Sequence, residues 1–164
     1  YTEAGKRAIS YRGTENPWGN IWHVIGNILI LNGQPYICTD YNYAPSVNNN
    51  YVGIGFYLSA TNGWISAMGL PNDNYNWIFM PIECANANSA APVGDNLWVK
   101  GTNGTFMAAV GGNWKFDEST GMFFYACDQD PYNATLRAYG ASLMYIPTKN
   151  SIYNANIQKW RDAQ

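Results

Sequence analysis

The chain consists largely of short apolar stretches separated by turn-forming residues. The clearest case is Asn32-Gly33, which lies between the apolar residues 28–31 and 35–38. Asn-Gly between apolar flanks favours a β-hairpin because both residues tolerate the positive φ that a type I′ turn requires. We therefore expect a strand, a tight turn and a second strand over residues 28–38. Further short strands are predicted at residues 52–58, 77–80, 105–110, 122–126 and 141–146.

Helical periodicity is weak in this sequence. Glycine, proline and asparagine recur every few residues and interrupt a helical pattern before it extends over several turns. The one helix that the pattern favours covers residues 151–163, with Ser151 as its cap and Ile152, Ile157 and Trp160 as a weak apolar set. Most of the chain is therefore expected to form strands and turns.

The composition fits one domain with a sizeable core. The chain has 164 residues, of which 47% are hydrophobic and 16% aromatic, but only 12% are charged, against a usual figure of about 25%. The net charge of −2 and the scattered Lys and Arg residues argue against nucleic-acid binding and against an acidic membrane surface, because both need a basic field. The apolar run at residues 28–31 is far too short for a membrane helix, and no apolar run in the sequence approaches the length of about 20 residues that such a helix needs.

The cysteines and the histidine are sparse. Cys38, Cys84 and Cys127 lie far apart, and His23 is the only histidine. This set does not have the spacing of a structural zinc site, so we expect no metal. An odd number of cysteines cannot pair completely within one chain. Free cysteines that are buried as small side chains are therefore favoured, and a disulfide between two of them is the alternative that stays open.

Patterns typical of catalysis are weak as well. Asp117-Glu118, or Asp128 with Asp130, could serve a paired-acid hydrolase, but both pairs lie in polar turn contexts that favour solvated loop acids. No Gly-x-Ser-x-Gly elbow accompanies the lone histidine, and Gly111-Gly112 lacks the third glycine of a phosphate-binding loop. We therefore expect no enzyme and no cofactor.

Two groups of motifs resemble a known fold family. Residues 15–22 read E-N-P-W-G-N-I-W, which is similar to the E-N-x-x-G-N-x-W signature of the C-type lectin fold in its formylglycine-generating-enzyme form. That form is shared by the variable proteins of diversity-generating retroelements and by phage receptor-binding modules. The second group follows in the family's order and comprises Gly94-Asp95, Gly111-Gly112-Asn113-Trp114, Gly121, Ala126, Pro131 and residues 140–147.

The resemblance implies an α+β fold, a C-type lectin-like fold dominated by short antiparallel strands and long loops. It divides the chain into the end of an upstream segment (1–10), the lectin-like domain (11–147) and a C-terminal tail with helical potential (148–164). One departure is Ser142, which stands where the family usually has arginine. A second is that the sequence starts close to the E-N-x-x-G-N motif, whereas family members usually carry strands and a helix before it. Residues such as Phe116 and Gly121 also hold the places of the two cysteines that bind copper in the oxidases of the family. The resemblance therefore implies neither copper nor oxidase activity.

The resemblance also implies a ligand-binding face between the G-G-x-W motif and the final strand, here residues 115–137. Aromatic rings in this stretch give rigid contact area, and its amides and carboxylates add directional hydrogen bonds. Several of the polar side chains are costly to bury unpaired and should face solvent. The candidate ligand-binding residues are Phe116, Asp117, Phe124, Tyr125, Asp128, Asp130, Tyr132 and Asn133.

The function favoured on these grounds is a non-enzymatic binding module. We expect a receptor-binding or decoration domain of a phage tail or head fibre, exposed on the virion surface, that recognises a bacterial surface glycan or protein. Further expected partners are other virion or fibre subunits, a homotrimer being one arrangement. Two alternatives stay open: a bacterial surface or pilus-tip adhesin, and a purely structural virion protein, because aromatic-rich loops suit a permanent interface equally well.

Overall fold

The computed structural model describes residues 10–11, 14–15, 17–40, 42–71, 73–85, 93–101, 103–116, 120–132 and 139–140. Within these residues the chain forms eleven strands and one 3-10 turn, η1. The elements are β1 (Ser10–Tyr11), β2 (Thr14–Glu15), β3 (Trp22–Leu31), β4 (Gln34–Cys38), β5 (Tyr51–Gly53), β6 (Gly63–Gly69), η1 (Asp73–Tyr75), β7 (Met80–Ala85), β8 (Asn96–Val99), β9 (Thr105–Val110), β10 (Tyr125–Gln129) and β11 (Tyr139–Gly140).

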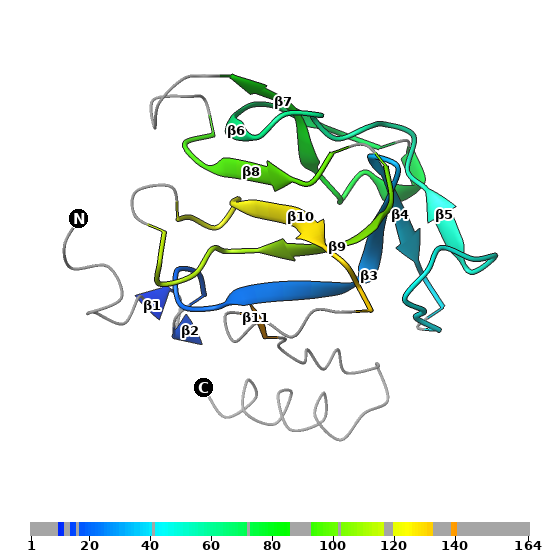
Figure 1. Ribbon diagram of the computed structural model, residues 1–164, viewed down its shortest axis with the longest axis horizontal. Helices are drawn as coiled ribbons and strands as arrows, with labels where there is room; N and C mark the ends of the chain where they lie inside the picture. The colour runs from blue at the N-terminus through cyan, green and yellow to red at the C-terminus, as the bar shows by residue number, and fades with distance from the viewer. Residues whose placement is uncertain are drawn as a thin grey trace, which may run out of the picture.

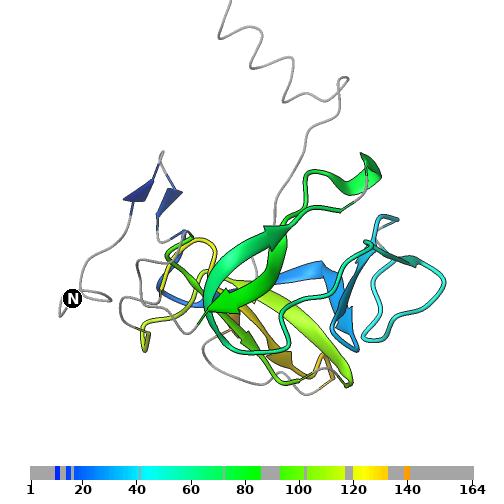
Figure 2. The ribbon, with the colours of Figure 1, turned by 90° about the horizontal axis from the view of Figure 1, so that it is seen from above.

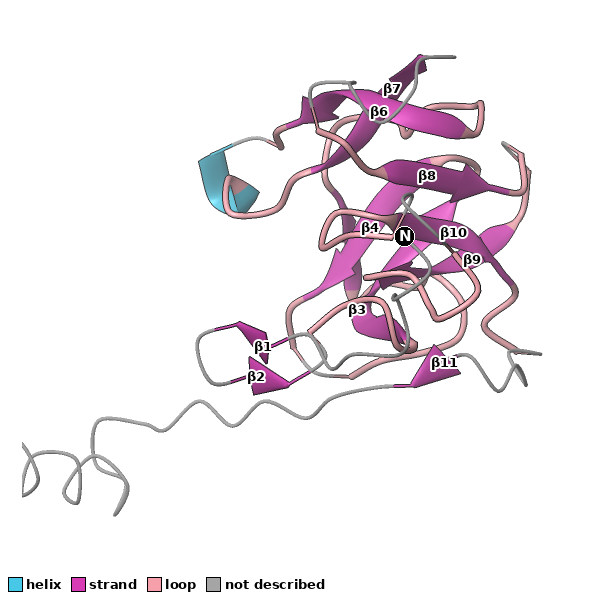
Figure 3. Ribbon diagram, turned by 90° about the vertical axis from the view of Figure 1, so that its left-hand side faces the viewer, coloured by secondary structure: helices cyan, strands magenta, loops and turns pink. Residues whose placement is uncertain are grey.

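The described part of the chain is essentially all β (Figure 3). The expected α+β, C-type lectin-like fold class is therefore wrong, since the short η1 is the only helical element within the described ranges. Glycine, proline and asparagine end each apolar stretch before a helix can form, whereas short strands gain stability by pairing with distant ones. The helix expected at 151–163 lies outside the described residues. In the part that is described, no helix has the length and apolar character that a membrane crossing needs.

Nine strands form one curled sheet with the shape of an open half-barrel (Figures 1 and 2). Its order is β5-β4-β3-β9-β10-β8-β6-β7, and β11 pairs with the start of β3. Most neighbours are antiparallel, but β10 runs parallel to β8, and β11 runs parallel to β3. The parallel pair β8 and β10 matters below, because its two strands end at the same edge of the sheet.

The hairpin predicted around Asn32-Gly33 is confirmed. β3 and β4 pair antiparallel, with Leu31 opposite Gln34 at the turn. Asn32 has a φ of 51° and Gly33 a φ of 82°, both in the left-handed region that a type I′ turn requires.

The other strand predictions differ in outcome. The strand at 105–110 is confirmed as β9. Only the start of 52–58 forms a strand, β5, and β7 begins at the last residue of 77–80. The segment 141–146 lies outside the described residues.

The strand expected at 122–126 is displaced toward the C-terminus and becomes β10. A turn precedes it, in which the Phe124 N–H donates to the Gly121 carbonyl oxygen at 3.2 Å. The Phe123 N–H donates to Oδ2 of Asp95 at 2.8 Å. These two bonds use donors that a longer strand would place in the sheet ladder.

The main core gathers side chains from one face of the central strands. Its members include Ile30 of β3, Ile65 of β6, Leu97 of β8 and Ala108 of β9, all with at most 2% of their surface exposed. A second cluster of Trp22, Ala109, Phe124 and Ala126 covers the opposite face of β9 and β10. The centre of the sheet is therefore covered on both faces, which holds the ends of β8, β9 and β10 in fixed positions.

The cysteines follow the expectation of buried small side chains only in part. Cys38 and Cys127 are buried, whereas Cys84 of β7 is half-buried. Burial raises the pKa of each of these thiols. All three are free thiols.

Candidate functional site

A groove lies at the edge of the sheet where β8 and β10 end and β9 begins. Because β8 and β10 are parallel, Val99 and Cys127 are register partners, and the segments that follow both strands leave the sheet on the same side. β9 starts at this edge too, since Gln129 pairs with Met107 in the antiparallel ladder. Figure 1 shows the ends of β8 and β10 and the start of β9 together.

Two neighbouring hollows form this groove. The first, of about 520 Å³, is lined by Val99, Lys100, Asp128, Gln129 and Asp130. The second, of about 480 Å³, is lined by Lys100, Asn103, Gly104, Thr105, Phe106, Asp130 and Tyr132. Lys100 and Asp130 line both, so the hollows are adjacent. Each is within the range of about 300–1,000 Å³ that is usual for ligand sites.

One lip of the groove is fixed by the β3–β4 turn. The Asn32 N–H donates to the Gly104 carbonyl oxygen at 2.9 Å, and the Gly104 N–H donates to Oδ1 of Asn32 at 3.0 Å. Gly104 has a φ of 116°, and a Cβ there would lie 3.1 Å from the Phe106 ring. The sharp turn of Asn32-Gly33 therefore clamps a loop that lies 72 residues further along the chain.

Replacing Asn32 by glycine tests this clamp. Glycine accepts the φ of 51° but removes the Oδ1 acceptor, so the free energy of unfolding should fall by about 1 kcal/mol. The Gly104 amide should also exchange its hydrogen faster, as measured by NMR. Asn32→Asp keeps an acceptor oxygen and is the matched control. Equal exchange rates at Gly104 in the two variants would contradict the clamp.

Asp128 forms part of the wall of the groove, and its carboxylate is held by Tyr139. The Tyr139 hydroxyl donates a hydrogen bond to its carboxylate, and the pKa of Tyr139 is raised by burial and by the negative charge of Asp128. Oδ1 of Asp128 is buried and accepts no hydrogen bond from the residues that the structure describes. The carboxylate therefore retains unused acceptor capacity.

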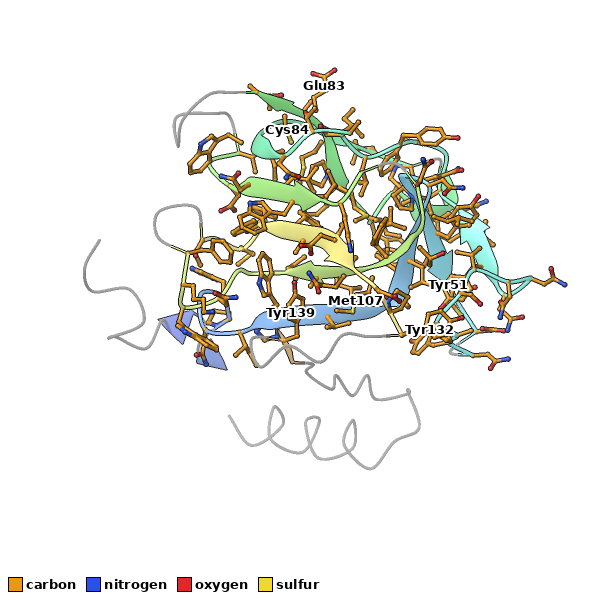
Figure 4. The ribbon with its side chains drawn as sticks, viewed as in Figure 1. Tyr51, Glu83, Cys84, Met107, Tyr132 and Tyr139 are labelled. Carbon is orange, nitrogen blue, oxygen red and sulfur yellow. The ribbon has the colours of Figure 1, made fainter. Side chains whose placement is uncertain are left out.

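Tyr132 is the exposed aromatic side chain of the groove. Its N–H donates to Oδ1 of Asp130 at 2.8 Å, which closes a tight turn directly after β10. The Tyr132 side chain is 65% exposed, and Figure 4 shows it beyond the end of β10. This turn presents the ring and the hydroxyl of Tyr132 to solvent at the mouth of the groove.

The structure brings three of the eight expected site residues together, namely Asp128, Asp130 and Tyr132. Phe124 is fully buried and Tyr125 is 7% exposed, so both rings belong to the core and are withdrawn as contact residues. The Tyr125 hydroxyl donates to the Phe79 carbonyl oxygen at 2.8 Å. Asp117 and Asn133 lie outside the described residues.

Phe116 is also placed away from the groove. Its ring packs edge-on against Trp98 at 4.7 Å and against Phe124 at 5.2 Å between ring centroids. It thus belongs to an aromatic cluster with Trp22, whose ring lies 5.9 Å away. Phe116 is withdrawn from the binding residues and interpreted as a support of the fold.

The sequence analysis missed the side chains that β8 and the β8–β9 connection contribute. Lys100 and Asn103 are exposed groove residues, and Gln129 completes the polar lining. The available signal was the turn-rich stretch K-G-T-N-G at residues 100–104 between two apolar strands. It predicts a surface loop, but it does not show which other segment lies beside that loop.

The residues that carry the family resemblance also meet in space. The Gly19 N–H donates to the Gly111 carbonyl oxygen at 2.7 Å, and the Trp114 N–H donates to the Asn20 carbonyl oxygen at 3.2 Å. These bonds join the E-N-x-x-G-N-x-W segment to the G-G-x-W segment. The motif residues therefore act as backbone contacts that hold two loops together.

The described side chains offer no metal centre. Among them, no group of three or more His, Cys, Asp or Glu residues is arranged to hold a metal ion. The groove instead offers hydrogen-bond donors, acceptors and one exposed ring, which suit reversible recognition of a polar ligand. No protein-family model matches the chain, and neither a curated protein nor a solved structure shows significant similarity to it.

Proposed function

We propose that this chain is a non-enzymatic binding module that recognises a bacterial surface glycan through the groove at the ends of β8 and β10. The observation that carries the proposal is the composition of that groove. The exposed Tyr132 ring lies beside Asp130, Lys100 and Asn103. A sugar ring has an apolar face that stacks on aromatic rings and hydroxyls that both donate and accept hydrogen bonds, so this lining suits it.

The biological setting that we propose is the surface of a virion, as a receptor-binding domain of a phage tail or head fibre. This part rests on the sequence resemblance to phage receptor-binding modules. A bacterial surface adhesin would use the same groove. The neighbouring genes separate the two settings, since capsid and portal genes favour the virion, whereas a sortase or chaperone gene favours the cell surface.

Tyr132→Ala is the variant that tests the proposal. Removing an aromatic residue at the centre of a binding face costs about 2 kcal/mol or more of binding free energy, so binding to host cells or to their purified surface polysaccharide should fall about thirtyfold. The melting temperature should be unchanged, because the side chain is 65% exposed.

Tyr57→Ala is the matched control for this experiment. Tyr57 is 64% exposed and does not line the groove. Its removal should leave binding within about twofold of the parent, since exposed residues outside a contact face contribute little. Equal binding by the parent and by Tyr132→Ala would refute the groove as the site.

A structural role in an assembly is the second candidate, and one surface favours it. Leu70, Trp77 and Phe79 on the connection between β6 and β7 are 70%, 61% and 39% exposed. The Phe79 ring lies 5.4 Å from the Phe123 ring. Large exposed apolar side chains often mark a protein interface where they form a patch. If the role is structural, Trp77→Ser should lower the oligomeric mass in sedimentation velocity and Tyr132→Ala should not.

A further inference from the structure

The described residues that line the groove carry an excess of negative charge. The ionisable side chains among them are Lys100, Asp128 and Asp130, apart from the phenol of Tyr132. Two carboxylates against one ammonium group give a net charge of −1. The chain as a whole is also negative, with a net charge of −2. A ligand that carries a carboxylate or a sulfate therefore meets repulsion both locally and at a distance.

The hydrogen-bonding chemistry of the two carboxylates points in the same direction. Asp128 is part of the lining of the first hollow, although its Oδ1 atom is buried. Asp130 is the shared wall of both hollows and accepts the Tyr132 N–H. Carboxylates accept hydrogen bonds and donate none, so a complementary ligand supplies donors here. Sugar hydroxyls meet this need and can also accept from Lys100.

We infer that the groove selects saccharides whose units carry no acidic group, that is, neutral sugars and amino sugars. The inference rests on the proposed function and adds the ligand class to it. Selection comes from the charge of Asp128 and Asp130, whereas the exposed ring of Tyr132 supplies contact area that any sugar could use. The charge and the ring can therefore be tested separately.

The experiment is a titration of the purified chain on an array of bacterial polysaccharides with neutral, amino-sugar and uronic-acid members. We expect neutral or amino-sugar glycans to bind and uronic-acid glycans not to bind, with binding of the neutral members changing less than about twofold between low and high salt. Tyr132→Ala is titrated in parallel, and it should lose the binding.

Asp130→Asn isolates the contribution of charge. Asparagine keeps an oxygen that can accept the Tyr132 N–H, but the negative charge is lost. Binding of neutral glycans should weaken by about tenfold, because a charge-assisted hydrogen bond becomes a neutral one. Binding of acidic glycans at low salt should rise by about threefold or more. Glu83→Gln removes the same charge from an exposed position on β7 that does not line the groove. This control should change neither the binding of neutral glycans nor the binding of acidic glycans.

The outcomes separate the two proposals. Acidic glycans that bind the parent chain and are lost with Tyr132→Ala would overturn the selection for non-acidic sugars and leave the groove as the binding site. The same increase in acidic binding for Glu83→Gln as for Asp130→Asn would assign the selectivity to overall charge and overturn the inference as well. Absence of all glycan binding, or binding that Tyr132→Ala leaves unchanged, would overturn the proposed function itself.

Discussion

Gly121→Ala should lower the free energy of unfolding by about 3 kcal/mol, from overpacking and from the loss of one hydrogen bond. A Cβ at this position would overlap Oδ1 of Asp95 and lie 2.6 Å from its Cγ. Asp95 is only 7% exposed and cannot move into solvent without leaving the Phe123 N–H unpaired. Gly121 is not among the glycines with positive φ, so the expected cost comes from the contact. Equilibrium denaturation with urea measures it.

A double-mutant cycle tests the cause. Asp95→Ala alone removes the acceptor of the Phe123 N–H and should itself be destabilising. In that background the space beside Gly121 is open, so Gly121→Ala should cost less than about 1 kcal/mol. An unchanged cost of Gly121→Ala in the Asp95→Ala background would show that the close approach to Asp95 is not the reason.

Trp22→Ala should destabilise the chain by about 3–5 kcal/mol, the usual cost of removing a large buried aromatic side chain. Trp22 is 2% exposed and begins β3. Its ring packs edge-on against Phe124 at 4.6 Å and stacks on Tyr139 at 6.1 Å between centroids. Tyr139 is also the β11 register partner of Trp22 and the donor to Asp128. The loss should therefore weaken ligand binding at the groove as well.

Trp77→Ala is the matched control for this prediction. Trp77 is 61% exposed, and its removal should change the free energy of unfolding by at most about 0.5 kcal/mol. Trp22→Phe keeps part of the ring contact, so its loss of unfolding free energy should lie between those of Trp22→Ala and Trp77→Ala. A Trp22→Ala chain as stable as Trp77→Ala would contradict the role assigned to the aromatic cluster.

Local signals in the sequence predicted two elements, the hairpin at residues 28–38 and the strand at 105–110. Asn32-Gly33 specifies its own turn, because the two residues that tolerate positive φ stand between two apolar stretches. Residues 105–110 form β9 for a similar reason, since Gly104 precedes them and Gly111 follows. The α component of the expected α+β fold class came from the family resemblance. The described residues form strands and one short 3-10 turn instead.

Burial on both faces explains why Phe124 and Tyr125 are core residues and not the contact residues that the sequence predicts. In a strand with one solvent-exposed face, residues are alternately buried and exposed, so one of two neighbouring side chains is available to a ligand. Here Phe124 packs in the cluster with Trp22, while Tyr125 packs in the main core on the other face. A strand covered on both faces loses the alternation, and only the arrangement of distant strands reveals this.

The groove itself could be predicted only in part. Burial cost predicts that Asp130 faces solvent, and the structure places it half-buried in the lining of the groove. Burial cost does not indicate the Tyr139 hydroxyl as a partner for Asp128. Lys100 and Asn103 reach the site because β8 pairs in parallel with β10. Parallel pairing joins segments that are far apart in sequence, and no local pattern in either strand encodes its partner.

The central claim, that the groove at the ends of β8 and β10 binds saccharide, is tested most directly by an NMR titration of the labelled chain with purified bacterial surface polysaccharide. The account predicts that the amide shifts of Lys100, Asn103, Asp130 and Tyr132 change with saturation. It predicts no change at Leu70 or Trp77 on the exposed apolar surface. Shift changes confined to Leu70 and Trp77, or the absence of any change at saturating polysaccharide, would contradict it.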